Sequence, residues 1–471
     1  MNDSVATKRS AHRTDSIGVW ATERPPRLRV AFATLGCKVN QYDTATIETA
    51  LLGRDCEIVP FSAVADVYVV NTCTVTDRAD AESRALARRA KRVNGQARVV
   101  MTGCMAQTSA QAAADLPEVD YVVGIGRLAD LLRAVRGEIG GQEGRIFSSN
   151  VRKARTVDTL GAEVFSGQTR AFLKVQEGCD LFCTFCIVPF ARGRSRSVEP
   201  RRVIGELERL ARNGFREVVL TGVHLGGYGR DLAPRLDLAD LVEMIAEQSP
   251  VPRLRLSSID PPEVTSRLLR IMKDSAVICP HLHVPVQAGT DPVLRRMRRQ
   301  YDAAMVRDVA IELRRAMPDA SLGTDVIAGF PGETEAEFEA GLALLDAAPF
   351  TYFHVFPYSR RSGTTAAKAT DPVLPATIRA RASVLRRLGE RKRIEFVQRF
   401  IGKRLRVLAE AKRDRETGLL VGYSRNYIRV LVRGGDDLVN RESWVQVVAG
   451  RRDRVLAEPI AAANRDATLE T

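Results

Sequence analysis

Short apolar runs alternate with longer mixed stretches in the first part of the chain. The runs are LRVAFATLG, DVYVVNTC, ARVVMTGC and DYVVGIG, and the stretches between them, over 44–52, 80–93 and 106–114, are rich in Ala, Arg, Glu and Gln. Continuous apolar strands that alternate with helices are typical of a parallel sheet covered by helices on both faces. The pattern predicts an N-terminal α/β domain over 27–137, after a polar leader over 1–26 that we expect to be disordered.

The alternation resumes on a larger scale after 138–165, a stretch with Gly, Ser and mixed charge but no clear period, which predicts a linker. Six candidate strands follow: FLKVQ, EVVLTG, LRLSS, HLHVPV, LGTDVIAG and TYFHVF. Amphipathic helices fall between them; Val203, Leu207 and Leu210, for example, share one helix face. Six strand–helix units over 166–397 predict an incomplete parallel (β/α)6 barrel, whose active site belongs at the carboxyl ends of its strands.

The last part of the chain changes period. RLRVLAE, NYIRVLVR and SWVQVVAG alternate apolar and polar residues with period two, as half-exposed antiparallel strands do. This predicts a small β barrel over 398–460, followed by a tail over 461–471. Residues 399–459 carry 14 Lys and Arg against 8 Asp and Glu, so the barrel is expected to be basic. No run approaches the roughly 18 apolar residues of a membrane helix, so we expect no membrane association.

Charge and cysteine content indicate the kind of partner and compartment. The 471 residues carry a formal net charge of +14, which favours nucleic acid as a partner, because neutralised phosphates release counterions. An Arg-rich and Ala-rich composition alone would give the same charge. Eight cysteines without a secretion signal indicate metal ligands in a reducing cytoplasm rather than a disulfide framework.

The densest signal is EGCDLFCTFC, directly after the first predicted barrel strand. It places Cys179, Cys183 and Cys186 with the spacing C-x3-C-x2-C. Three thiolates on so short a loop can hold three irons of a 4Fe–4S cluster and leave the fourth iron without a protein ligand. A structural zinc site would need a fourth Cys or His nearby, and the sequence offers none.

Three further cysteines share one register. Cys37, Cys73 and Cys104 each come within three residues of the end of a Val-rich strand, in ATLGC, VVNTC and VMTGC. Because such positions converge on one edge of a parallel sheet, we expect these thiols to meet and to hold a second 4Fe–4S cluster, again with one iron free. The alternative is three small buried residues. Cys56 and Cys279 have no such partners and are interpreted as structural.

The cysteine loop resembles that of the radical S-adenosylmethionine superfamily, in which the open iron is chelated by the amino and carboxylate groups of the cofactor. The resemblance implies that Phe185 lies near the adenine and that the backbone of 221–223 passes the methionine amino group. It also makes Asp325 a candidate for contacts with the cofactor hydroxyls. Core packing for Phe185 and a structural role for Asp325 are the alternatives. The cofactor contacts are thus expected from Phe185, Thr221, Gly222, Val223 and Asp325.

Over nearly the whole chain the motifs resemble the methylthiotransferases: TLGCKVNQYDT, VNTCTVTDRAD, TGCMAQ, VQEGCDLFCTFCIVPFARGRSRS, TDVIAGFPGETE and FPYSRRSGT match in kind and order. The final segment resembles the TRAM domain, an RNA-binding β barrel. The resemblance implies that the barrel cluster reduces S-adenosylmethionine to a 5′-deoxyadenosyl radical, which takes hydrogen from the substrate. It further implies that the N-terminal cluster supplies sulfur, and that a second S-adenosylmethionine supplies the methyl group.

Branches of this family differ in substrate. LGCKVNQYDT, with Lys38 and Gln41, looks most like the branch that modifies carbon 2 of N6-threonylcarbamoyladenosine in tRNA. The alternatives are isopentenyladenosine in tRNA and an aspartate of a ribosomal protein. Two other readings stay open: a radical enzyme whose N-terminal cluster only relays electrons, and a non-catalytic iron–sulfur protein that binds RNA or senses redox state.

The expected partners are the anticodon loop of tRNA and an electron donor such as flavodoxin or ferredoxin, with no DNA and no membrane. ARGRSRS is predicted to contact phosphates, and the last barrel places aromatic residues among basic ones, a layout suited to stacking and phosphate contact. Ordinary surface charge is the alternative for both. The predicted RNA contacts are Arg192, Arg194, Arg196, Arg425, Tyr427 and Arg429. His281, His283 and His354 are interpreted as core residues of the barrel.

Overall fold

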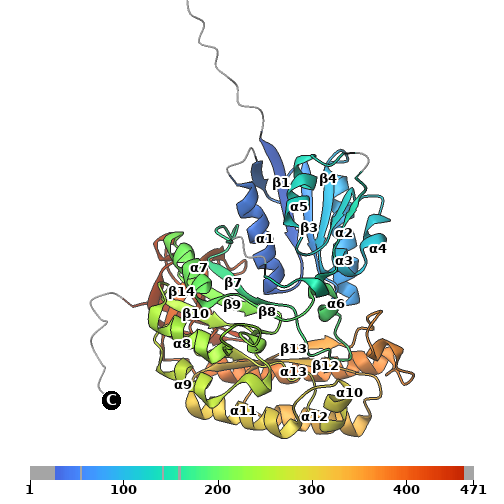
Figure 1. Ribbon diagram of the computed structural model, residues 1–471. Helices are drawn as coiled ribbons and strands as arrows, with labels where there is room; N and C mark the ends of the chain where they lie inside the picture. Colours follow the sequence, from blue (N-terminus) through green and yellow to red (C-terminus); the bar gives the residue numbers. More distant parts are fainter. Residues whose placement is uncertain (1–26, 53–55, 141–142, 158–160, 461–471) are drawn as a thin grey trace, which may run out of the picture.

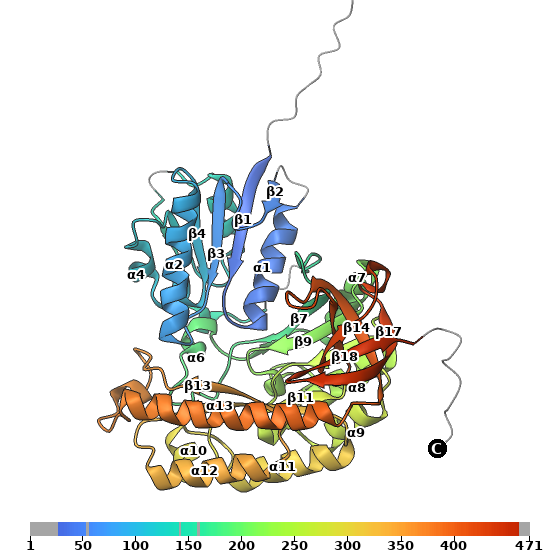
Figure 2. The same cartoon turned by 180° about the vertical axis from the view of Figure 1, so that it is seen from behind.

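The computed structural model describes residues 27–52, 56–140, 143–157 and 161–460. The predicted leader over 1–26 and the tail over 461–471 lie outside the described residues. Figures 1 and 2 show an N-terminal α/β domain above a central barrel, with a small barrel at the side of the central one. The predicted fold class, three units in this order, is confirmed.

The N-terminal domain is a six-stranded parallel sheet in the order β2-β1-β3-β4-β5-β6. Buried side chains alternate along its strands between two apolar clusters, so helices cover both faces, as the continuous apolar strands predicted. The strands are β1 Leu28–Thr34, β2 Cys56–Val59, β3 Val67–Thr72, β4 Arg98–Gly103, β5 Tyr121–Val123 and β6 Ile146–Phe147. The helices are α1 Lys38–Leu51, α2 Asp77–Val93, α3 Cys104–Thr108, α4 Ala110–Ala114 and α5 Leu128–Arg136.

Strand β6 lies inside the stretch that the sequence predicted to be a linker. It pairs in parallel with β5 and extends the sheet by one strand. Two residues give no detectable period, so this strand depends on the neighbouring edge rather than on its own sequence.

The central unit contains six parallel strands, β7, β9, β10, β11, β12 and β13, as predicted. Single bridges join the two sheets of this incomplete barrel between β10 and β11. The short β8 pairs antiparallel with β7. The strands are β7 Arg170–Glu177, β8 Arg196–Ser197, β9 Glu217–Gly222, β10 Arg253–Leu256, β11 His281–His283, β12 Ser321–Ala328 and β13 Tyr352–Pro357.

Helices cover the outside of the central barrel, and α7 shows why they form. Val203, Leu207 and Leu210 make its buried face, and Pro200 at its first position needs no hydrogen-bond partner for its nitrogen. The α-helices are α6 Val188–Arg192, α7 Pro200–Arg212, α8 Leu238–Gln248, α9 Ser266–Asp274, α10 Asp291–Arg296, α11 Ala303–Ala316, α12 Glu335–Ala347 and α13 Pro375–Gln398. The 3-10 turns are η1 Val151–Lys153, η2 Leu225–Gly227, η3 Pro261–Glu263, η4 Ala366–Lys368 and η5 Asp436–Leu438.

The long helix α13 packs on β12 and β13 and leads into the C-terminal barrel (Figure 2). That barrel is closed in the order β14-β15-β16-β18-β17, so it leaves no free strand edge. Phe396, in the last turn of α13, and Phe400, just after the helix, are part of the core of this barrel. The strands are β14 Arg404–Arg413, β15 Leu420–Ser424, β16 Arg429–Val432, β17 Glu442–Arg451 and β18 Arg454–Pro459. Among the described helices none is long and apolar enough to cross a bilayer.

Candidate active site

One cavity of about 350 Å³ collects the cysteines of both predicted sites. Its walls come from the strand ends of the N-terminal sheet and from the mouth of the central barrel. They include both cysteine triads and every residue predicted to contact the cofactor. These residues are Cys37, Cys73, Cys104, Cys179, Cys183, Cys186, Phe185, Thr221, Gly222, Val223 and Asp325.

The N-terminal triad is assembled by three adjacent parallel strands. Cys37 caps α1 just after β1, Cys73 directly follows β3, and Cys104 opens α3 after β4. Because β1, β3 and β4 are neighbours, their carboxyl ends meet at one edge. Gly36 has a φ of +86°, and a Cβ there would lie 2.7 Å from the sulfur of Cys73. Glycine therefore lets the Cys37 loop approach Cys73.

The loop after β7 carries the second triad and is held by hydrogen bonds at both ends. The N–H of Cys179 donates to the carbonyl of Gly193 at 3.0 Å, and the hydroxyl of Thr184 donates to the carbonyl of Arg296 at 2.9 Å. Gly178 has a φ of +75°, and a Cβ there would lie 1.9 Å from a backbone oxygen of the segment after α6. The loop is thus fixed before any ligand binds.

Burial governs the protonation of these thiols. It raises the pKa of Cys104, Cys179 and Cys186 to about 12, and it also raises the pKa of Cys73 and Cys183. The thiolate is the form that binds metals. A cationic metal group bound here therefore displaces protons and compensates charges that the cavity alone disfavours.

The sulfur atoms of each triad lie too far apart to bind a single metal ion together. Among the described residues, neither cysteine triad brings its three sulfurs within 4.8 Å of one another. One tetrahedral zinc ion, with Zn–S bonds of about 2.3 Å, would need them closer. Three thiolates at a wider spacing are the donor set of a 4Fe–4S cluster with one open iron.

Arg299 contacts the barrel triad directly. Its Nη1 donates to the sulfur of Cys183 at 3.0 Å, its Nε donates to the hydroxyl of Tyr301 at 2.9 Å, and Asp260 forms an ion pair with its other nitrogen. Sequence analysis missed this role, because four arginines within RRMRR look alike on a helix. The buried guanidinium places a positive charge beside the thiol that the loop presents.

Asp325, on β12, lies in the cavity wall and is held by two histidines. It accepts a hydrogen bond from His283 Nε2 at 2.8 Å and lies 3.2 Å from His354 Nδ1. Burial opposes ionisation, but His283 and His354 hold the pKa of this carboxyl well below its usual range. The hydroxyl of Tyr352 joins His283 to His281, so the histidines interpreted as core residues form a polar chain inside the barrel.

The other predicted cofactor residues line the same wall. The half-buried ring of Phe185 packs edge-on against Phe330, with ring centroids 6.4 Å apart. The strand β9 ends at Thr221 and Gly222, where the side-chain carbonyl of Gln176 accepts the backbone N–H of His224 at 2.8 Å. Thr221, Gly222 and Val223 line the cavity at this strand end.

The structure corrects two of the predicted RNA contacts that follow the cluster loop. The side chain of Arg192 is 1% exposed and forms ion pairs with Glu177 and with Asp43 of α1, each at 2.8 Å. Arg196 is buried and donates to backbone carbonyls. Arg192 joins the two domains through Asp43, and Arg196 donates to the carbonyls of Val151 and Arg192, so both guanidinium groups are engaged inside the protein instead of reaching phosphate. Arg194 is exposed, and its contact with RNA stays a prediction.

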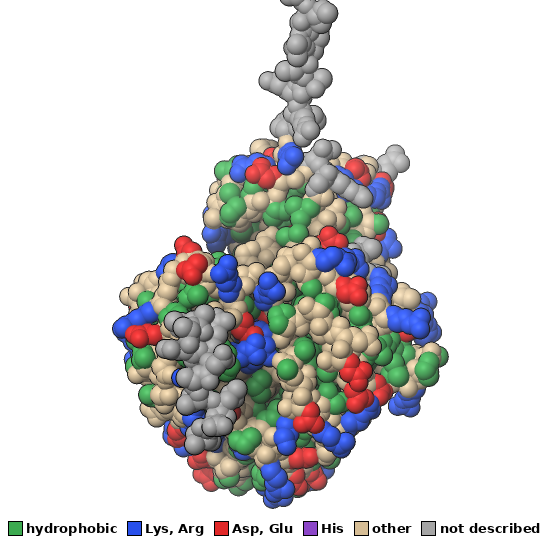
Figure 3. All heavy atoms as spheres, turned by 90° about the vertical axis from the view of Figure 1, so that its left-hand side faces the viewer, with side chains coloured by type: hydrophobic (Ala, Val, Ile, Leu, Met, Phe, Trp, Pro, Cys, Tyr) green, Lys and Arg blue, Asp and Glu red, His purple; other side chains and the backbone are tan. Residues whose placement is uncertain are grey.

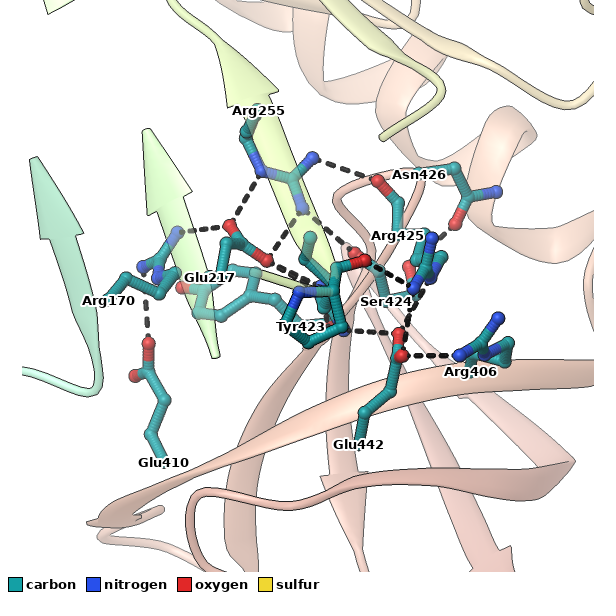
Figure 4. Close-up of polar contacts among 12 residues, drawn as sticks. Arg170, Glu217, Arg255, Arg406, Glu410, Tyr423, Ser424, Arg425, Asn426 and Glu442 are labelled. Carbon is teal, nitrogen blue, oxygen red and sulfur yellow. Dashed lines mark hydrogen bonds and ion pairs between the residues drawn. The ribbon is translucent and has the colours of Figure 1, made fainter. Parts of the chain in front are cut away.

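Two of the predicted contacts in the C-terminal barrel, Arg425 and Tyr427, are also corrected, and Figure 4 shows the contacts of Arg425. Arg425 forms an ion pair with Glu442 at 2.7 Å and donates to the carbonyl of Pro252 in the central barrel. Tyr427 packs against His281 with ring centroids 4.5 Å apart. Both attach the small barrel to the central one, so they do not present a stacking surface to RNA.

Arg429 pairs with Asp414 at 3.1 Å within the small barrel, and its contact with RNA stays a prediction. On the face shown in Figure 3, Lys and Arg side chains are interspersed with Asp and Glu. The positive charge of the chain is therefore not gathered into one patch on that face.

Comparison with known proteins shows which families the chain resembles. The model of the radical SAM superfamily matches residues 173–345, and the model of uncharacterized protein family UPF0004 matches 29–124. The threonylcarbamoyladenosine tRNA methylthiotransferase MtaB of Bacillus subtilis (strain 168) is 39% identical over 428 residues, which cover 89% of this chain and 93% of that protein. The protein of the same name from Aquifex aeolicus (strain VF5) is 39% identical, covering 81% of this chain and 92% of its own length.

More distant matches include the tRNA-2-methylthio-N(6)-dimethylallyladenosine synthase of Staphylococcus haemolyticus, 31% identical, covering 88% of this chain and 81% of that protein. Among solved structures, the radical S-adenosylmethionine methyltransferase TsrM from Kitasatospora setae has a TM-score of 0.53 at 17% identity. The match covers 72% of this chain and 77% of that chain, and it supports the fold.

An incomplete barrel with a three-cysteine loop after its first strand defines a radical S-adenosylmethionine enzyme. The cysteine triad of the N-terminal sheet, which lines the same cavity as the barrel loop, distinguishes this chain from radical enzymes that have only the barrel triad. The chain belongs to the family of threonylcarbamoyladenosine tRNA methylthiotransferases.

Proposed function

We propose that the chain inserts a methylthio group at carbon 2 of N6-threonylcarbamoyladenosine, next to the anticodon of tRNA. One observation carries the proposal: the two cysteine triads, from separate domains, open into one cavity of about 350 Å³. A sulfur donor and a radical generator must reach the same substrate atom, and a shared cavity meets that requirement. The names of the most similar relatives support the substrate.

The two sets of three thiolates indicate which cofactors the chain holds. Cys179, Cys183 and Cys186 would hold the 4Fe–4S cluster that binds S-adenosylmethionine, and the N-terminal triad would hold the second cluster. Bound together, these groups supply the radical chemistry that an unreactive C–H bond requires. The residues of the chain position and enclose them. Arg299 donates a hydrogen bond to Cys183 and would orient it, and Asp325, kept ionised by its histidines, would accept hydrogen bonds from the hydroxyl groups of the cofactor.

The partners follow from the same proposal. The substrate is the anticodon loop of tRNA, and the reductant is a protein of the flavodoxin or ferredoxin type. Arg194, exposed beside the cysteine loop, and Arg429 on the small barrel are the remaining candidates for phosphate contact.

The first test is mass spectrometry of nucleosides from the tRNA of a deletion strain and its parent. The proposal expects 2-methylthio-N6-threonylcarbamoyladenosine to disappear in the deletion strain and its unthiolated precursor to accumulate. Complementation with the intact gene restores the product, and so does Cys56→Ala, a matched control because Cys56 lies outside the cavity. An unchanged level of the nucleoside in the deletion strain would overturn the proposal.

The relatives named as dimethylallyladenosine synthases supply a second candidate substrate. If the isopentenyladenosine product disappears instead, the substrate is that base; if neither product changes, a ribosomal-protein aspartate becomes the substrate to examine. An enzyme whose N-terminal cluster only relays electrons would transfer no sulfur to any of them.

A further inference from the structure

The basic side chains around the cavity are paired, with one exception. Arg192 pairs with Glu177, Arg299 pairs with Asp260, and the ring of His224 lies 3.1 Å from a carboxylate oxygen of Glu263. Among the described residues that line the cavity, Lys38 is the basic side chain for which no carboxylate lies within 4.0 Å. It also makes no hydrogen bond with the described residues. A cation thus faces the cavity without a protein partner.

Lys38 is the first residue of α1, directly after Cys37, and it lines the cavity together with Ser257 and Asp325 of the central barrel. Ser257 directly follows β10, and Asp325 lies on β12. The side chain therefore extends from the N-terminal domain over the strand ends of the barrel, where a substrate enters.

The charged groups of the barrel that influence Lys38 already have partners of their own. Arg170 pairs with Glu410 at 3.2 Å, and Arg255 pairs with Glu217 at 2.8 Å (Figure 4). Asp325 accepts hydrogen bonds from two histidines. Among the described residues no carboxylate lies within 4.0 Å of Lys38, so an arriving anion would be its first charged partner.

A half-buried ammonium without a partner is costly, and an anion that binds to it removes that cost. We propose that Lys38 forms a subsite for the carboxylate of the substrate, the anionic end of the threonylcarbamoyl group. This inference rests on the proposed function and adds the residue that recognises the substrate class. A neutral isopentenyl group would leave Lys38 unpaired, so the same contact discriminates against that base.

The test uses the holoenzyme, reconstituted without oxygen, and three synthetic anticodon stem–loops. One carries N6-threonylcarbamoyladenosine, one carries its methyl ester, which lacks the charge, and one carries unmodified adenosine. The wild-type protein should bind the first RNA about 10–100-fold more tightly than the ester, the range expected for a hydrogen bond to a charged group. Lys38→Met should bind both equally, and Lys38→Arg should keep part of the preference.

Lys273→Met serves as the matched control, because Lys273 is exposed on α9 and outside the cavity. Iron content and the visible spectrum of Lys38→Met should equal those of the wild type. Retention of the ester discrimination in Lys38→Met would overturn the subsite, and so would loss of iron with the discrimination intact, which would make Lys38 the charge partner of a cluster. If the wild-type enzyme fails to methylthiolate the first RNA at all, the proposed function fails instead.

Discussion

At the scale of single residues, the site contains basic side chains of the same charge whose roles depend on their contacts. Arg192 and Arg299 are both buried arginines beside a cysteine triad, and each is neutralised by a carboxylate of the protein. Lys38 has the same charge in the same cavity but no such carboxylate. The first two hold the framework, whereas the third is available to a ligand.

Mutations in the two triads should have different effects on the reaction. Cys183→Ala removes a ligand of the barrel cluster and should abolish cleavage of S-adenosylmethionine under reductant. Cys37→Ala should spare that cleavage and block the insertion of sulfur. Liquid chromatography of 5′-deoxyadenosine and of digested tRNA measures both. Cys279→Ala, a buried cysteine outside the cavity, is the control. Methylthiolated product from Cys37→Ala would exclude the N-terminal triad as the source of sulfur.

Arg299 should increase the affinity of the barrel triad for iron. Arg299→Met removes the hydrogen bond to Cys183 and leaves Asp260 as an uncompensated carboxylate beside the thiols. Loss of an outer partner of a metal ligand costs about 10–100-fold in metal affinity. Iron release to a chelator, followed by absorbance, should therefore be faster in the variant. Arg298→Met is the control, since Arg298 lies next in sequence but outside the cavity; equal rates in all three proteins would contradict the role.

At the scale of elements, the junctions between strands and helices place the chemistry. Each cysteine of the N-terminal triad follows the end of a strand, and the barrel triad lies in the loop after β7. Helix boundaries depend on local hydrogen bonds. α12, for example, begins with a capping box in which Thr334 and Glu337 satisfy each other's backbone N–H groups.

Thr334→Ala should destabilise the protein by about 1 kcal/mol, because it leaves a backbone N–H at the start of α12 without its acceptor. The free energy of unfolding in denaturant measures the change. Thr365→Ala is the matched control: Thr365 precedes a helical turn, but its side chain makes no capping bond. An equal loss in both variants would indicate that the cap contributes nothing.

At the scale of the whole molecule, buried ion pairs attach the three units to one another. Asp43 of α1 pairs with Lys174 of β7 at 2.7 Å across one interface. Glu217 of β9 is fully buried between Arg253 and Arg255, which reach the carbonyls of Tyr423 and Ser424 in the C-terminal barrel (Figure 4). Such pairs fix the orientation of the small barrel.

Glu217→Gln should cost about 3–5 kcal/mol at neutral pH, because it leaves two buried arginines without their carboxylate. Burial opposes the charge, but Arg255 and Arg253 lower the pKa of Glu217 to about 2. Because the folded pKa lies below the unfolded one, this stabilisation is complete above about pH 4.5 and is lost as the pH falls toward 2.

The difference in unfolding free energy between the wild type and Glu217→Gln should therefore shrink as the pH falls through that window. Denaturant titrations at several pH values measure it. Glu247→Gln, at an exposed position of α8, should show no such trend. A difference that stays constant with pH would show that Glu217 does not stabilise the interface through its charge.

The boundaries of the helices show where hydrophobic periodicity fails to predict the structure. The helix predicted over 44–52 begins instead at Lys38, and the one predicted over 106–114 is two short helices, α3 and α4. The missing first turn of α1 contains Val39 and Asn40, which are buried against the rest of the fold. Polar residues buried by another domain give no amphipathic signal, so the pattern starts too late.

The sequence by itself determined the order of three features along the chain. Three strands of a parallel sheet each end near a cysteine, a loop with three cysteines follows, and strands with a period of two form the last barrel. Strand ends in a parallel sheet share one edge, so register alone predicted that Cys37, Cys73 and Cys104 would meet. The class of chemistry followed from donor type and spacing, which are local properties of the chain.

Only the tertiary structure decided which charged residues are free. Arg192 pairs with a residue 149 positions away, and Arg253 pairs with one 189 positions away. No local pattern reports such a contact, so the sequence predicted RNA contacts for Arg192 and Arg425 that the fold uses to join its parts. The fold also leaves Lys38 without a carboxylate partner among the described residues. The residue type gives the charge of a side chain, whereas its burial and its partner depend on the whole fold.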